Sequence, residues 1–132
     1  MTKFKLMDQK ALVAFAVEHQ KEMGADGITA GEIEEKLQSG AAVLEVWDDC
    51  FAVVELKGPR PHLWLLYVAS ESRGRRLGSR FLRALLKKYS CEYHMSLYCE
   101  GAKRRAFFGR HGFRIESREG EMRRMTTNPD IY

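Results

Sequence analysis

The chain has 132 residues, of which 45% are hydrophobic and 30% charged. This length and composition fit one globular domain with its own core, so residues 1–132 are treated as a single domain. No apolar run approaches the ~18 residues that cross a membrane, and the first ten residues lack the apolar stretch of a secretory signal. Three cysteines without the spacing of a zinc site predict a cytoplasmic protein with reduced thiols, no disulfide framework and no bound metal.

The net charge of +4 conceals a strong asymmetry along the chain. Residues 73–110 hold 11 Lys and Arg but only two acidic residues, a net charge of +9. The rest of the chain holds 11 basic and 16 acidic residues, a net charge of −5. A concentrated positive field attracts an anion, and nucleic acid, a membrane headgroup and a phosphorylated cofactor are the three candidates.

The N-terminal part of the chain predicts two helices. Apolar residues at helical spacing predict the first over residues 7–23, ended by Gly24. A capping box that begins at Thr29 opens the second, which ends before Gly40. The remaining expected elements are strands at 43–47, 51–56 and 62–68, a helix at 78–89, a strand at 93–99, a helix at 102–111, and strands at 113–116 and 122–126.

The run at residues 62–68 is almost continuously apolar, which is typical of a central strand covered on both faces. A helix follows it, then a strand, a short helix and two more strands. This order predicts a mixed sheet with helices on both faces.

The loop that joins this strand to the helix at 78–89 is the most informative segment. It contains Gly74 and Gly78, and its arginines are Arg73, Arg75 and Arg76. Glycines let a ligand approach the backbone closely, and the unpaired first N–H groups of a helix bind phosphate. The spacing fits neither a Walker A loop nor the dinucleotide-binding fingerprint. The loop therefore predicts a cradle for a pyrophosphate group.

Strand, loop and helix together resemble motif A of the GNAT acetyltransferase superfamily. Its signature is Gln or Arg, two residues, Gly, one residue, then Gly or Ala. Arg73 stands at the first position and Gly78 at the last, while Arg76 replaces the usual middle glycine. The segment from 106 to 113, which ends in Gly-Phe, resembles the family's second hallmark. The resemblance covers roughly residues 43–126 and implies an α/β (α+β) domain with a mixed, mostly antiparallel sheet, two splayed central parallel strands and helices on both faces.

The same resemblance implies an N-acetyltransferase that uses acetyl-CoA. The strand backbone would pair with the pantetheine arm, and the N–H groups of the loop would hold the pyrophosphate. The implied cofactor-binding residues are Leu66, Tyr67, Val68, Arg73, Gly74, Arg75, Arg76, Leu77, Gly78, Ser79 and Phe108.

The catalytic residues match the family less closely. Acetyl transfer needs a base that keeps the amine neutral and donors for the developing oxyanion and the released thiolate. The family's frequent Tyr acid corresponds to Phe108, which cannot donate a proton, and its frequent Glu base corresponds to Ser96. We therefore assign catalysis to His62, where some family members place a base, and to Tyr98, near the end of the second splayed strand. An exposed strand-edge His and an amphipathic sheet Tyr are the alternative interpretations.

The acetyl acceptor is expected beside the first two helices, where the family places it, here about residues 23–31. Acidic residues nearby predict a primary amine, small molecule or peptide, with a cationic character. These residues are Glu18, Glu22, Asp26, Glu32, Glu34 and Glu35.

Two other functions stay open. One is a CoA-binding regulatory module without turnover, suggested by Phe108. The other is a nucleic-acid-binding domain, suggested by the basic segment, although no nucleic-acid-binding motif accompanies the charge, so no nucleic-acid partner is expected. No membrane partner is expected, and the resemblance leaves a homodimer open.

Overall fold

The computed structural model describes residues 3–57, 60–89 and 94–127. The helices are α1 (Gln9–Glu18), α2 (Ala30–Ser39), α3 (Leu77–Tyr89) and α4 (Ala102–Gly109), with 3-10 turns η1 (Phe4–Leu6), η2 (Gln20–Met23) and η3 (Ser70–Ser72). The strands are β1 (Ala42–Val46), β2 (Cys50–Lys57), β3 (Arg60–Val68), β4 (Ser96–Glu100), β5 (Phe113–Glu119) and β6 (Met122–Thr127). None of the helices within these ranges is long and apolar enough to cross a membrane.

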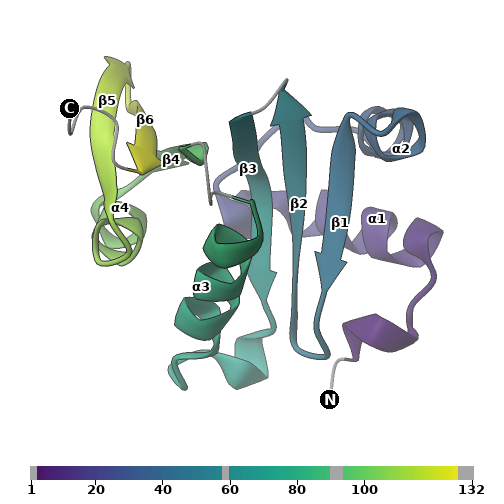
Figure 1. Cartoon of the computed structure of the whole chain (residues 1–132). Coiled ribbons are helices and arrows are strands. Elements are labelled where there is room, and N and C mark those ends of the chain that lie inside the picture. The colour runs from purple at the N-terminus through teal and green to yellow at the C-terminus, as the bar shows by residue number, and fades with distance from the viewer. Residues whose placement is uncertain (1–2, 58–59, 90–93, 128–132) are drawn as a thin grey trace.

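All six strands form one sheet in the order β1-β2-β3-β4-β6-β5. Only the central pair, β3 and β4, is parallel, and its ladder contains just two residue pairs, His62 with Ser96 and Leu63 with Leu97. Beyond this point β3 continues beside β2 as far as Val68, while β4 continues beside β6 (Figure 1). The two central strands therefore diverge, which confirms the expected splayed, mostly antiparallel sheet.

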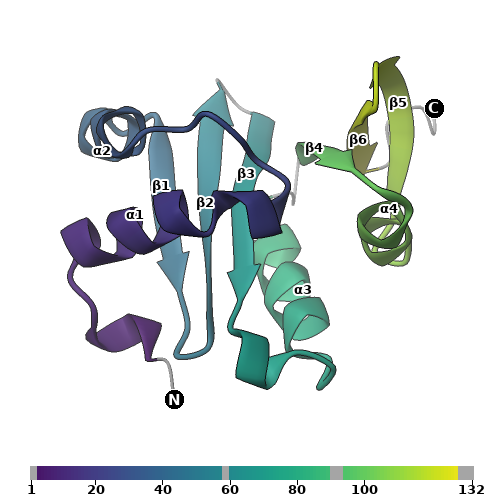
Figure 2. The ribbon, with the colours of Figure 1, turned by 180° about the vertical axis from the view of Figure 1, so that it is seen from behind.

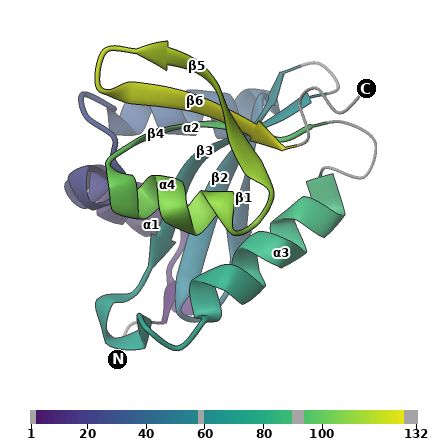
Figure 3. The same ribbon diagram turned by 90° about the vertical axis from the view of Figure 1, so that its left-hand side faces the viewer.

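Helices cover the sheet on both sides, as expected. α1 and α2 lie over β1–β3 (Figure 2), where Leu12, Phe51 and Leu65 belong to one buried cluster. α3 and α4 lie on the other side (Figure 3), where Phe81 and Leu97 belong to a second cluster. β3 is therefore covered on both faces, which explains its continuous apolar run.

A bulge in β3 lies where the central strands begin to diverge. Val53 pairs with Leu65, and its neighbour Val54 pairs with Leu63, so Trp64 is an extra residue without a partner in β2. Because of this extra residue, Leu63 packs on the α3 side of the sheet while Leu65 packs on the α1 side. The bulge thus changes which face of the sheet the β3 side chains occupy, at the point where β3 and β4 separate.

The first predicted helix is wrong in its extent, because α1 ends at Glu18 and η2 follows as a separate turn. The side-chain amide of Gln20 donates to the carbonyl of Ile28 at 2.9 Å and accepts from the Ile28 N–H at 2.8 Å. These bonds hold η2 against the chain that precedes α2. The Thr29 cap is confirmed, because its hydroxyl accepts from the N–H of Glu32 at 3.2 Å.

Later elements also differ from the prediction, and the strand expected at 113–116 extends to Glu119. The strand expected at 93–99 begins at Ser96, and residue 93 lies outside the described residues. The last helix ends at Gly109, two residues earlier than expected. Cys50 and Cys99 are buried free thiols, whereas Cys91 lies outside the described residues.

Candidate active site

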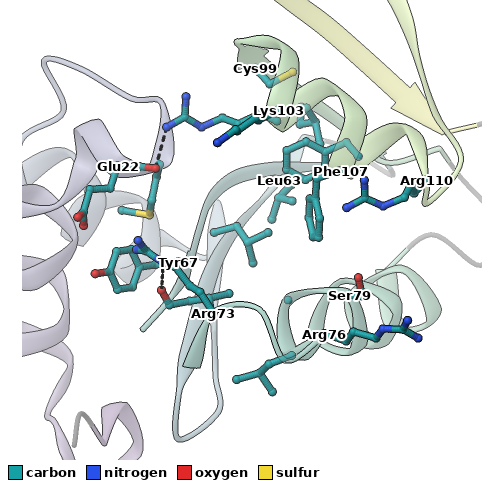
Figure 4. A pocket seen from close by; sticks show the side chains of 18 of the residues that line it. Glu22, Leu63, Tyr67, Arg73, Arg76, Ser79, Cys99, Lys103, Phe107 and Arg110 are labelled. Atoms are coloured by element: carbon teal, nitrogen blue, oxygen red, sulfur yellow. Dashed lines mark hydrogen bonds between the residues drawn. The ribbon is translucent and has the colours of Figure 1, made fainter. Parts of the chain in front are cut away.

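A cavity of about 520 Å³ lies between the diverging strands, bordered by the loop before α3 and by α4 (Figure 4). This volume is in the range of small-molecule and cofactor sites. Every residue that the sequence assigns to the cofactor lines it except Arg75, which is exposed elsewhere. The lining members of that set are Leu66, Tyr67, Val68, Arg73, Gly74, Arg76, Leu77, Gly78, Ser79 and Phe108.

The loop before α3 adopts left-handed backbone conformations at two positions. Gly74 has φ +84° and Arg76 has φ +61°. The family usually has glycine at the position of Arg76, so the chain keeps the turn and accepts the strain of a side chain there. Arg73 fixes the start of the loop, because its Nε donates to the carbonyl of Val68 at 3.0 Å.

Gly78 lets β3, α3 and α4 approach one another closely. A Cβ at this position would lie 3.4 Å from Cγ2 of Val68 and 3.5 Å from Cζ of Phe107. Both neighbours line the cavity, so a larger side chain would have to enter it. Gly78 thus keeps the cavity open beside the first turn of α3.

The charges around the cavity favour an anionic ligand. Arg76 and Arg110 line it from the side of α3 and the end of α4, Glu22 lies on the opposite side, and the Arg73 side chain extends from the loop toward Tyr67 (Figure 4). Glu22 is the only one of the six acidic residues named above that lines the cavity. A hydrogen bond from His19 lowers the pKa of Glu22 below its usual value and so keeps it ionised. The arginine-lined end of the cavity lies beside the N-terminus of α3, and the rest of the lining is largely apolar. This combination fits a ligand that has both phosphates and an extended arm.

Arg104 of α4 reaches across the divergence of the strands to η2. Its Nη2 donates to the carbonyl of Glu22 at 2.8 Å, and its Nη1 donates to the carbonyl of Glu100 at 3.2 Å. The guanidinium also lies against Gly24, where an added Cβ would contact it at 3.4 Å. This bridge fixes η2 as one wall of the cavity.

The two predicted catalytic residues lie together where β3 and β4 still pair. His62 is 6% exposed, and its Nδ1 lies 2.7 Å from Oγ of Ser96. The ring centroids of His62 and Tyr98 are 5.3 Å apart. Tyr98 lines both the large cavity and a second cavity of about 250 Å³, whereas His62 lines only the second. His62 is therefore a buried central-strand residue and not an exposed edge histidine.

Phe108 lines the large cavity without offering a proton donor there. Its ring packs edge-on against Phe107 and Phe113, with centroids 5.1 and 5.5 Å away. Phe108 therefore offers no hydroxyl at this position of α4. Tyr98 does offer a phenol, since it lines the large cavity and its ring centroid lies 5.3 Å from that of His62.

His111 is a site residue that the sequence did not suggest. Its Nε2 lies 3.0 Å from Oγ of Ser79, which lines the cavity beside α3. Burial, with the nearby charges of Arg83 and Arg110, lowers the pKa of His111 and favours the neutral imidazole. The two partners are 32 residues apart, Ser79 in α3 and His111 in the turn after α4, so no local pattern could have indicated their contact.

Comparisons with known proteins agree with this geometry. The fold is similar to that of the PaiA N-acetyltransferase from Thermoplasma acidophilum in complex with coenzyme A, at 14% identity over 93% of this chain and 80% of that chain, with TM-score 0.65. It is also similar to the ribosomal-protein-S18-alanine N-acetyltransferase from Escherichia coli, at 12% identity over 92% of this chain and 89% of that chain, with TM-score 0.70.

A GNAT family acetyltransferase from Elizabethkingia anophelis with acetyl-CoA bound matches 75% of this chain and 82% of its own, at 13% identity and TM-score 0.62. At these identities the similarity shows the fold alone. No curated protein matches the sequence. The model of the acetyltransferase (GNAT) family, however, matches residues 11–113, which is most of the chain. The chain therefore belongs to the GNAT family of acetyltransferases, which use acetyl-CoA as the acetyl donor.

Proposed function

We propose that this protein transfers the acetyl group of acetyl-CoA to a primary amine by direct attack of the amine on the thioester. The observation that carries the proposal is the large cavity, which the arginine-rich loop, the free edge of β3 and α4 line together. Acetyl-CoA would supply an acetyl group activated as a thioester. The overall change forms an amide C–N bond and breaks the C–S bond, while one amine proton is lost and the released sulfur gains one.

The proposed binding mode uses backbone groups first. The N–H groups of residues 74–79 at the start of α3 would hold the pyrophosphate, helped by Arg76 and Arg110. Beyond Leu63, β3 has no partner in the described part of β4, so its free edge can pair with the pantetheine arm. Leu66 and Val68 would pack against the arm's apolar portions.

We assign the proton transfers to His62 and Tyr98. His62 would accept the amine proton, and the hydroxyl of Tyr98 would donate to the developing oxyanion or the released sulfur. Cys99 also lines the cavity, but burial raises the pKa of its thiol and disfavours the thiolate. This protonated thiol supports direct transfer to the amine over a covalent acetyl-cysteine route.

The acceptor is proposed as a primary amine on a small molecule or peptide. The acidic rim expected from the sequence is reduced at the large cavity to Glu22, so the cationic character of the acceptor has little support there. The buried free thiols of Cys50 and Cys99 support the prediction of a reducing, cytoplasmic location.

A thiol-release assay with acetyl-CoA and a panel of amines, amino acids, polyamines and peptides tests the proposal. We expect amine-dependent thiol release, with one acetylated amine per released thiol by mass spectrometry. Binding of acetyl-CoA without release for any acceptor would favour the regulatory module. Absence of binding would refute both functions.

A further inference from the structure

The second cavity, of about 250 Å³, lies over the residues where β3 and β4 pair. Arg60 and His62 of β3, Ser96 and Tyr98 of β4, and Arg124 of β6 contribute to its lining. These side chains alternate with Leu63 and Leu97, which pack in the core below α3. The second cavity therefore opens on the sheet face opposite α3 and α4.

Its floor is formed by His62, Ser96 and Thr126, which belong to a row of polar residues across four strands. Glu55, His62, Ser96 and Thr126 are successive partners in the strand register. Glu55, His62 and Thr126 are each at most 6% exposed. Nζ of Lys36 binds the Glu55 carboxylate at 2.7 Å, and His62 binds Ser96 at the same distance. These two bonds hold the side chains of Glu55 and His62 in place on this face of the sheet.

The charges above this floor favour an anion. Arg60 makes no ion pair with any residue in the described part of the chain. Arg124 pairs with Glu116, the only carboxylate in the lining among the described residues. His94 adds a second imidazole to that of His62. The described part of the lining therefore holds one guanidinium more than it holds carboxylates, and a guanidinium binds a carboxylate through paired hydrogen bonds.

Tyr98 connects this anion-favouring cavity to the proposed reaction site, because it lines both cavities. An acceptor amine placed beside His62 and Tyr98 would have the rest of its molecule in the second cavity. We propose that the acceptor is a small primary amine that also carries a carboxylate, as an amino acid does, and that the carboxylate binds Arg60 and Arg124. This inference rests on the proposed function, which places the amine at His62 and Tyr98.

A comparison of matched acceptors tests the inference. Amino acids, β-alanine among them, are compared in kcat/KM with their neutral amides, with 2-aminoethyl phosphate and with 1,3-diaminopropane. We expect each amino acid to exceed its amide by about tenfold or more, mainly through KM, which is the effect of one charge-assisted contact. Equal turnover of acid and amide, or preference for the diamine, would overturn the inference. Preference for the phosphate would overturn the carboxylate assignment.

Two substitutions locate the effect. Arg60→Gln and Arg124→Gln should each reduce the ratio of acid to amide kcat/KM about tenfold. Arg118→Gln, on exposed β5 outside the lining, should leave the ratio unchanged. Because Arg60 has no ion pair among the described residues, its substitution tests the site without breaking one. An unchanged ratio in Arg60→Gln would contradict the proposal.

A binding measurement separates this inference from the proposed function. β-Alanine is titrated by calorimetry into the protein saturated with CoA, for the wild type and for Arg60→Gln. Binding that Arg60→Gln weakens, in a protein that turns over no amine, would support the site and refute the reaction. Turnover of neutral amines with no binding of β-alanine would refute the site and leave the reaction intact.

Discussion

The cofactor side and the acceptor side of the central strands are built in different ways. The proposed cofactor side is a contiguous loop, residues 73–79, whose backbone N–H groups we assign to the pyrophosphate. The proposed acceptor side consists of single side chains on separate strands, such as His62, Tyr98 and Arg124. A backbone site tolerates sequence change provided that the turn is kept, as Arg76 in a glycine position illustrates. A side-chain site loses a function with each substitution. Substitutions on the two sides should therefore have different consequences.

The largest expected effect is the closure of the cofactor side by Gly78→Leu. The new side chain would meet Val68 and Phe107 and fill the cavity beside α3. We expect acetyl-CoA affinity to fall at least about a hundredfold, because the ligand and the side chain compete for one volume. Calorimetry measures this, with Gly31→Ala as the control, since an added Cβ there has no neighbour within 4 Å. Unchanged affinity in Gly78→Leu would place the cofactor elsewhere.

Substitutions at the reaction site should affect kcat and leave cofactor affinity largely intact. Tyr98→Phe and His62→Gln should each lower kcat about a hundredfold, the usual contribution of a general acid or base. Tyr89→Phe is the matched control, because its hydroxyl bonds Glu45 and it does not line the cavity. Wild-type kcat in both Tyr98→Phe and His62→Gln would remove our catalytic assignments.

Arg76→Gly should have a smaller effect, which raises the stability of the protein and lowers its affinity for acetyl-CoA. Glycine relieves the left-handed strain at φ +61°, so the free energy of unfolding should rise by roughly 1 kcal/mol. Loss of the guanidinium should weaken acetyl-CoA binding at the same time. Urea unfolding and calorimetry measure the two changes. A fall in stability would show that the Arg76 side chain stabilises the loop by more than its strain costs.

The smallest expected effect is the pH dependence that His111 contributes. Its lowered pKa means that, just below pH ~6.5, the unfolded chain binds a proton that the folded protein does not. The free energy of unfolding should therefore rise with pH through this window and fall on acidification. His111→Gln should flatten the dependence when urea unfolding is measured across the window. A steeper pH dependence of the free energy of unfolding in the variant would mean that the pKa of His111 is raised in the folded protein and not lowered.

Much of the fold could be predicted because its signals are local. Thr29 caps α2 through a bond to a residue three positions away, and the apolar run of β3 follows from cover on both faces. The limits of α1 could not be predicted. They depend on the Gln20 side chain, which bonds the backbone of Ile28 after the intervening chain has turned back.

The same distinction holds within the site. Residues 73–79 form a local pattern with its own backbone requirement, and the structure places all but Arg75 at the cavity. The contacts of Arg104 with η2 and of His111 with Ser79 join segments distant in sequence, so only the fold reveals them. The second cavity depends on the pairing of β3 with β4 and of β4 with β6, which brings together strands distant in the sequence.

The most direct test of the account is a calorimetric titration of the wild-type protein with acetyl-CoA and with dephospho-CoA. We predict saturable binding of one acetyl-CoA per chain, and weaker binding of dephospho-CoA, which keeps the pyrophosphate assigned to Arg76 and Arg110 but lacks the 3′-phosphate, a further negative charge that the basic surroundings of the cavity attract. Absence of binding for both compounds would contradict the central claim that the diverging strands and the loop before α3 form a coenzyme A site.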